Sequence, residues 1–146
     1  MTTRSRPGML VAATCVAATL VACASTGKSG GGTLAGTSWQ LVRFQGGDGA
    51  VLTPDDPSKY TLTFNADGSV QARFDCNSGR GIYTLNPPSG LEFGTVVMSR
   101  TECPPPSLYG DLARRWSYIR SYVIRDGHLH MSMMADGGIF EWAPAR

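Results

Sequence analysis

Apolar and polar residues alternate with a period of two over much of the chain after residue 36. Residues 60–64 (Tyr-Thr-Leu-Thr-Phe) and 70–74 (Val-Gln-Ala-Arg-Phe) place an apolar side chain at every second position, which is typical of half-buried strands. Residues 65–68 (Asn-Ala-Asp-Gly) separate them, and Gly68 can adopt a positive φ at little cost. The pattern predicts a β-hairpin over residues 60–74.

The same reasoning predicts further strands along the chain. They are expected at residues 38–44, 81–85, 91–98, 122–124, 129–131 and 139–142. Pro87-Pro-Ser-Gly90 separates the second from the third, and Asp136-Gly-Gly138 precedes the last. Arg125-Asp-Gly127 lies between residues 122–124 and 129–131, so these two strands are expected to form a second hairpin.

One segment has helical spacing instead. Leu108, Leu112, Trp116, Ile119 and Val123 recur every three or four residues, which places them on one side of a helix. Three prolines at 104–106 must precede that helix, Ser107 is a suitable N-cap, and Asp111 suits its positive end. One amphipathic helix over one face of an antiparallel sheet predicts an α+β fold with about eight short strands.

The first residues have the pattern of a signal peptide. Residues 1–8 carry Arg4 and Arg6 and no acid, and residues 9–21 are uncharged and apolar. A 13-residue helix would span only about 20 Å, too short for the bilayer core of about 30 Å. Leu20-Val-Ala-Cys23 resembles the lipobox of bacterial lipoproteins, which implies acylation of Cys23 and cleavage before it. The alternatives are an ordinary secreted protein cleaved after an alanine and a buried N-terminal helix.

This reading divides the chain into three parts. We expect a lipoprotein signal peptide at 1–22, a flexible Gly/Ser-rich tether at 23–33 and one domain at 34–146. The formal charge of the whole chain is +2, and removal of Arg4 and Arg6 leaves the mature protein formally neutral. Because the basic residues form no cluster beyond Arg114-Arg115, a nucleic-acid partner is not expected.

The four cysteines separate by position. Cys15 belongs to the signal peptide and Cys23 is the expected lipidation site, so Cys76 and Cys103 remain inside the domain. Two thiols in an oxidising compartment are expected to form a structural disulfide. A catalytic or metal-binding pair is the alternative, but the cysteines lack Cys-x-x-Cys spacing and have no histidine near them in the sequence.

Residues 128–134 (His-Leu-His-Met-Ser-Met-Met) are the stretch most similar to a metal site. Imidazole and thioether ligands suit Cu(I). On a strand, however, Met131 and Met133 share the core face, which leaves His128, His130 and Met134 as candidate ligands. Core methionines beside exposed histidines explain the pattern without a metal, so no metal or cofactor is predicted.

No recognisable catalytic motif is present, and the protein is not expected to be an enzyme. Glu92, Glu102 and Glu141 alternate with apolar neighbours and are interpreted as solvated residues. Asp75 with Cys76, Asn77 and Arg80 is the most site-like polar cluster, although turn chemistry explains it equally simply. Most aromatic residues are expected in the core, while Tyr109 and Tyr118 lie off the helix's apolar stripe and are candidates for exposure.

The order of motifs resembles the META/HslJ family of small bacterial domains. The resemblance is carried by Gly36-Thr-Ser-Trp-Gln-Leu41, Phe64 with Gly68, Cys76-Asn77 with Gly81 and Tyr83, Arg100 with Cys103-Pro104, Tyr122 with Gly127 and Leu129, and Phe140. Asp75 replaces the family's usual glycine before Cys-Asn, and Ser99-Arg-Thr-Glu-Cys103 replaces its Thr-Arg-Met-Ala-Cys run. The resemblance implies a curved antiparallel sheet, half-barrel-like, with one helix across its open side. It also implies links to heat shock, novobiocin resistance and motility, and hence to stress response, with no established enzymatic reaction.

The leading functional hypothesis is therefore a lipid-anchored, non-enzymatic domain of the bacterial cell envelope. Its expected partners are the membrane, through the acyl chains on Cys23 (palmitate or a similar chain), and an envelope protein or a small amphipathic ligand. In a bacterium with two membranes, Ala24 after the lipidated cysteine implies the periplasmic side of the outer membrane. The alternatives are a lysozyme or protease inhibitor lipoprotein and a periplasmic copper-binding protein.

Overall fold

The computed structural model describes residues 1–2 and 33–146. Residues 3–22 of the predicted signal peptide, with Cys15, Cys23 and nearly all of the tether, lie outside the described residues. The strands are β1 (Thr37–Gly46), β2 (Val51–Leu52), β3 (Tyr60–Phe64), β4 (Ser69–Phe74), β5 (Asn77–Asn86), β6 (Gly90–Phe93), β7 (Val97–Met98), β8 (Ile119–Arg125), β9 (His128–Met133) and β10 (Gly138–Pro144). The helices are α1 (Tyr109–Arg115) and the short 3-10 turns η1 (Pro57–Lys59), η2 (Trp116–Tyr118) and η3 (Met134–Asp136).

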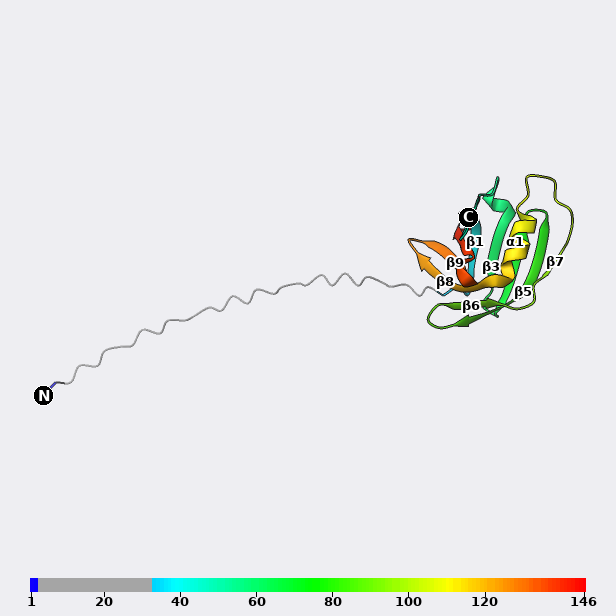
Figure 1. Ribbon diagram of the computed structural model, residues 1–146. Coiled ribbons are helices and arrows are strands. Elements are labelled where there is room, and N and C mark those ends of the chain that lie inside the picture. The colour runs from blue at the N-terminus through cyan, green and yellow to red at the C-terminus, as the bar shows by residue number, and fades with distance from the viewer. Residues whose placement is uncertain (3–32) are drawn as a thin grey trace.

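Eight of the strands form a closed antiparallel barrel, seen in Figure 1. The order is β1-β3-β4-β5-β6-β8-β9-β10, and β10 pairs with β1 from Trp39↔Pro144 to Gly46↔Gly138 to complete the ring. β2 extends beside β1, and β7 pairs with β5 at Gly79 and Arg80. The expected open half-barrel of α+β class is therefore wrong: the fold is mostly β, with one short helix. The pairing of β1 with β10 closes the ring. It joins two segments about a hundred residues apart, so no local pattern in the sequence indicates it.

Both predicted hairpins are confirmed. β3 and β4 pair from Tyr60↔Phe74 to Phe64↔Val70, and Gly68 in the turn has φ +83°. β8 and β9 are joined by Asp126 and Gly127, which have φ +53° and +76°, with Arg125 opposite His128. Positive φ at both central residues is the type I′ geometry that two-residue hairpins prefer.

The helix is much shorter than its hydrophobic spacing predicted. α1 ends at Arg115, η2 follows, and Ile119 begins strand β8. Residues 119–125 (Ile-Arg-Ser-Tyr-Val-Ile-Arg) are rich in β-branched and aromatic side chains, and β9 offers them a partner strand, so pairing overrides the helical period. Val123, expected on the helix's apolar stripe, is exposed on β8.

The barrel interior is filled by large apolar side chains. Trp142, Tyr60, Phe44, Phe64, Phe74 and Phe140 are each no more than 1% exposed. The buried core of the described residues runs from Leu34 to Trp142, so the domain from residue 33 onward carries a complete core of its own. Among the helices of the described part of the chain, none has both the length and the apolar character needed to cross a membrane.

Candidate functional site

One end of the barrel is covered by α1 together with a short segment, residues 94–98, which we call the strap. Leu112 and Trp116 bury their side chains in the barrel end, and the backbone N–H of Leu108 donates to the Tyr60 hydroxyl at 3.0 Å. The strap lies against β5 at two glycines. A Cβ at Gly79 would come within 2.7 Å of the Val97 carbonyl oxygen, and one at Gly81 within 2.9 Å of the Thr95 carbonyl oxygen. The strap can therefore approach β5 only because both positions lack a side chain.

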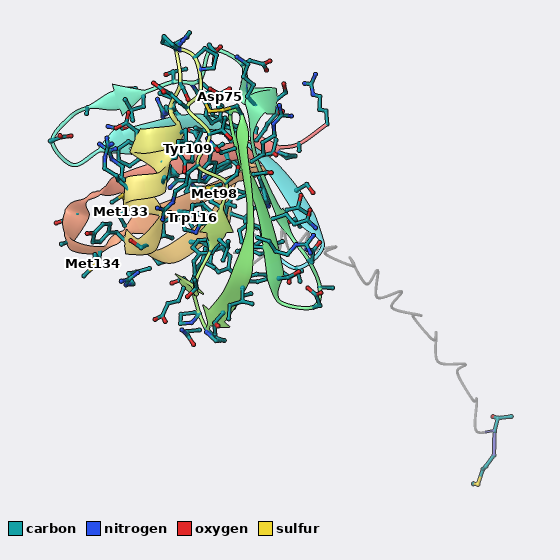
Figure 2. The ribbon with its side chains drawn as sticks, turned by 90° about the vertical axis from the view of Figure 1, so that its right-hand side faces the viewer. Asp75, Met98, Tyr109, Trp116, Met133 and Met134 are labelled. Carbon is teal, nitrogen blue, oxygen red and sulfur yellow. A yellow bond between two sulfur atoms is a disulfide. The ribbon has the colours of Figure 1, made fainter. Side chains whose placement is uncertain are left out.

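A groove of about 510 Å³ lies between the strap and α1, and we call it the mouth groove. Its lining is part apolar and part polar, and the apolar part includes Phe74, Val96, Met98, Ala113 and Trp116. Figure 2 shows Met98 and Trp116 close together beside α1, below Tyr109. The volume is within the range typical of small-molecule sites, which also favour the mouths of β-barrels.

Three polar groups line or edge this groove. Arg100 lies at the exposed edge, and within the described residues its guanidinium makes no hydrogen bond or ion pair. The Tyr109 hydroxyl donates to the Ser99 carbonyl at 3.0 Å, which holds the strap's outgoing chain against the helix. The Trp116 indole N–H is buried and has no acceptor in the part of the chain that the structure describes.

Behind the groove, the chain from residue 99 to 103 is held by Asn77, which is fully buried. The Asn77 side-chain Oδ1 accepts hydrogen bonds from Thr101 N at 2.7 Å and Ser99 Oγ at 3.0 Å. Its Nδ2 donates to the Thr101 carbonyl at 2.8 Å. The expected disulfide between Cys76 and Cys103 is present, with Cα atoms 5.7 Å apart, and fixes the same segment covalently. These contacts set the position of Arg100.

Asp75 does not form a chemical site with its neighbours. It has φ +59°, its backbone N–H donates to the Lys59 carbonyl, and its own carbonyl accepts from Arg73 Nε. Along β5 Asn77 is buried and Arg80 is exposed, so the polar cluster seen in the sequence is split between the two faces of the barrel wall. The positive φ of Asp75 fits the turn of the simpler interpretation, whereas Asn77 bonds the distant Thr101 and both Gly79 and Gly81 lie within β5.

His128 and His130 lie on the outer face of β9, with ring centroids 6.5 Å apart. His128 Nδ1 lies 2.8 Å from a Glu141 oxygen, and Arg43 Nε donates to the other oxygen at 2.8 Å. The hydrogen bond from His128 lowers the pKa of Glu141, and the bond from Arg43 lowers it further. Burial lowers the pKa of His130.

The third candidate ligand, Met134, is exposed in η3, beyond the end of β9. Figure 2 shows it beside Met133 at one edge of the domain. Over residues 33–146 no three or more His, Cys, Asp or Glu side chains gather in a way that could hold a metal ion.

The candidate carboxylates and exposed tyrosines are dispersed. Glu92 lies on β6, Glu102 in the loop before α1 and Glu141 on β10, and in the described chain no hydrogen bond joins any two of them. Tyr118 is 49% exposed, as expected, whereas Tyr109 is half-buried.

The mouth groove is not evident from the sequence alone. Phe74, Val96 and Met98 fall in expected strands, Ala113 carries no signal of its own, and Arg100 stands out only as part of the family resemblance. The available clue was the pair Gly79 and Gly81, spaced by two on one face of a predicted strand, because such glycines indicate that another backbone approaches there.

Comparison with known proteins identifies the domain. The META domain family profile matches residues 32–141. The chain belongs to the META domain family. The resemblance read from Cys76-Asn77, Arg100 and the other motifs is thus confirmed, whereas no curated protein matches the chain by sequence.

Two solved structures share the fold of this META domain. A protein from Burkholderia xenovorans, solved by NMR, is 20% identical, with a TM-score of 0.66, and the match covers 77% of this chain and 83% of that one. A crystal structure of a DUF4847 family protein from Bacteroides vulgatus is 14% identical, with a TM-score of 0.54, covering 75% of this chain and 93% of that one. At these identities the likeness concerns the fold.

Proposed function

We propose that this META domain is a lipid-anchored, non-enzymatic binding domain of the bacterial cell envelope. The anchor is the acylated Cys23, and residues 24–33 tether the barrel to the membrane surface. In a host with two membranes the location is the periplasmic side of the outer membrane. The domain acts by binding an envelope protein or a small amphipathic ligand, in envelope maintenance or tolerance of stress.

The observation that carries the binding role is the filled barrel interior. Aromatic and aliphatic side chains occupy the space that larger barrels leave for a ligand, so contact with a partner takes place on the outside and at the ends. The mouth groove offers an apolar wall with a polar edge at such an end, and the disulfide and Asn77 hold that edge in place. Rigid walls favour binding because little conformational entropy is lost when a ligand arrives.

The anchor is tested by metabolic labelling with a radioactive fatty acid. The wild-type chain is expected to incorporate label and to sediment with membranes, while Cys23→Ser is expected to lose both. Cys15→Ser is the matched control, because Cys15 lies within the segment that is removed. Equal labelling of Cys23→Ser would disprove the anchor.

Copper binding is a second candidate, favoured by one contact. A metal-binding histidine usually donates its other ring N–H to a carboxylate, and His128 Nδ1 already lies 2.8 Å from Glu141. Titration with Cu(I) against a competing chelator tests it. A tight site lost in the double variant His128→Ala, His130→Ala supports this function, and an unchanged affinity removes it.

A further inference from the structure

We propose that the mouth groove binds the acyl chain of a single-chain amphipath with an anionic head group, typified by a medium-chain carboxylate. This inference rests on the proposed function, since it names the ligand class for the binding domain. It places the apolar chain between the strap and α1, and the carboxylate at Arg100.

The apolar part of the groove fits an acyl chain. Phe74 and Trp116 pack edge to face, with centroids 5.4 Å apart, and form one wall. Met98 and Val96 face them from the strap, and methionine adapts readily to chains of different shape. On the side of α1 the groove stays open because the side chain of Ala113 is small, and any larger residue there would project into the groove.

The charge at the edge selects the head group. Arg100 is exposed, and no carboxylate of the described residues pairs with it. The nearest acid along the helix, Asp111, is already paired with Arg114 and Arg115, each at 2.8 Å. A guanidinium beside an apolar wall binds a carboxylate through two parallel hydrogen bonds, which a cationic head group cannot form.

The test uses the unlipidated domain from residue 33, which carries its complete core, and the fluorescent probe anilinonaphthalene sulfonate. The probe combines aromatic rings with an anionic group and is expected to bind with enhanced fluorescence. Decanoate is expected to displace it, whereas butyrate, which lacks the chain, and decyltrimethylammonium, which reverses the charge, are not. Concentrations are kept below those at which the amphipaths form micelles.

Two exposed substitutions locate the site without affecting the core. Arg100→Gln is expected to weaken decanoate binding about tenfold or more, and Ala113→Leu to block the groove and reduce probe binding to a similar extent. Arg125→Gln and Ala66→Leu are matched controls, because both positions are exposed and lie away from the groove. Both controls are expected to bind as wild type.

Several results would overturn the inference. The first is that the folded domain does not bind the probe. The second is that decanoate and decyltrimethylammonium displace the probe equally well. The third is that Arg100→Gln or Ala113→Leu binds as the wild type does. None of them affects membrane anchoring, which the labelling of Cys23 decides separately.

Discussion

The side-chain amide of Asn77 pairs with the backbone of Thr101 as a neighbouring strand would. Its Oδ1 accepts from the Thr101 N–H at 2.7 Å and its Nδ2 donates to the Thr101 carbonyl at 2.8 Å. One fully buried side chain thus replaces a β-ladder where the chain leaves β7 and crosses toward α1. The position of Arg100 at the mouth groove therefore depends on Asn77.

Replacement of Asn77 by alanine is expected to lower the free energy of unfolding by about 1 to 3 kcal/mol, because both Thr101 backbone groups lose their partner. Urea denaturation of the purified domain measures the change. Asn86→Ala is the control, since Asn86 is exposed at the end of β5. Equal midpoints for the two variants would show that the amide pairing does not stabilise the fold.

The local parts of this fold could be predicted from the sequence, and the closure of the barrel could not. The β3–β4 and β8–β9 hairpins follow from alternation and from Gly68 and Asp126-Gly127, all within a few residues of one another. The contact that makes a barrel of the sheet, β1 with β10, joins Phe44 to Phe140 and depends on the curvature of every strand between them.

The end of the helix was predicted wrongly for a different reason. The interval from Trp116 to Ile119 fits a helical turn, but Trp116 is the last core residue of the helical segment and Ile119 is the first of β8. Because the end of the helical segment and the start of β8 pack against the same core, their buried apolar residues follow one another at a spacing that looks helical. The mouth groove was missed because its walls come from β4, the strap and α1, and their meeting is a property of the whole fold.

The Cys76–Cys103 disulfide is expected to stabilise the domain by about 3 to 4 kcal/mol, because it closes a loop across a sequence separation of 27 residues. Thermal unfolding with and without reductant measures this as a lower midpoint in reductant. The double variant Cys76→Ser, Cys103→Ser serves as the control and should be insensitive to reductant. An unchanged midpoint for the wild-type protein would contradict the prediction.

Glu141 is expected to contribute to stability at neutral pH. Its pKa in the folded protein is lowered from the usual 4.5 by hydrogen bonds from His128 and Arg43, so the contribution is present above pH 4.5 and lost as pH falls through the folded value. Glu141→Gln should reduce the free energy of unfolding by about 0.5 to 1 kcal/mol at pH 7. The difference from wild type should vanish in strong acid, where both side chains are neutral.

Urea titrations at several pH values measure this difference. Glu92→Gln is the matched control, because Glu92 is exposed on β6 and its side chain makes no hydrogen bond or ion pair within the described residues. A Glu141→Gln deficit that persists unchanged at low pH would mean that the side chain acts through packing, not charge.

Gly79 is expected to control the strap. A Cβ there would approach the Val97 carbonyl oxygen to 2.7 Å and the Met98 Cα to 3.2 Å, so Gly79→Ala must push β7 away from β5. The free energy of unfolding is expected to fall by about 1 to 3 kcal/mol, with faster amide hydrogen exchange confined to the strap.

Gly110→Ala is the opposite case, because a Cβ in the first turn of α1 meets only the flexible end of Arg114 at 3.4 Å. That change should raise stability by about 0.5 to 1 kcal/mol, since alanine favours the helix. If both alanines had the same effect, the close approach of the strap to β5 would not be what requires a glycine at position 79.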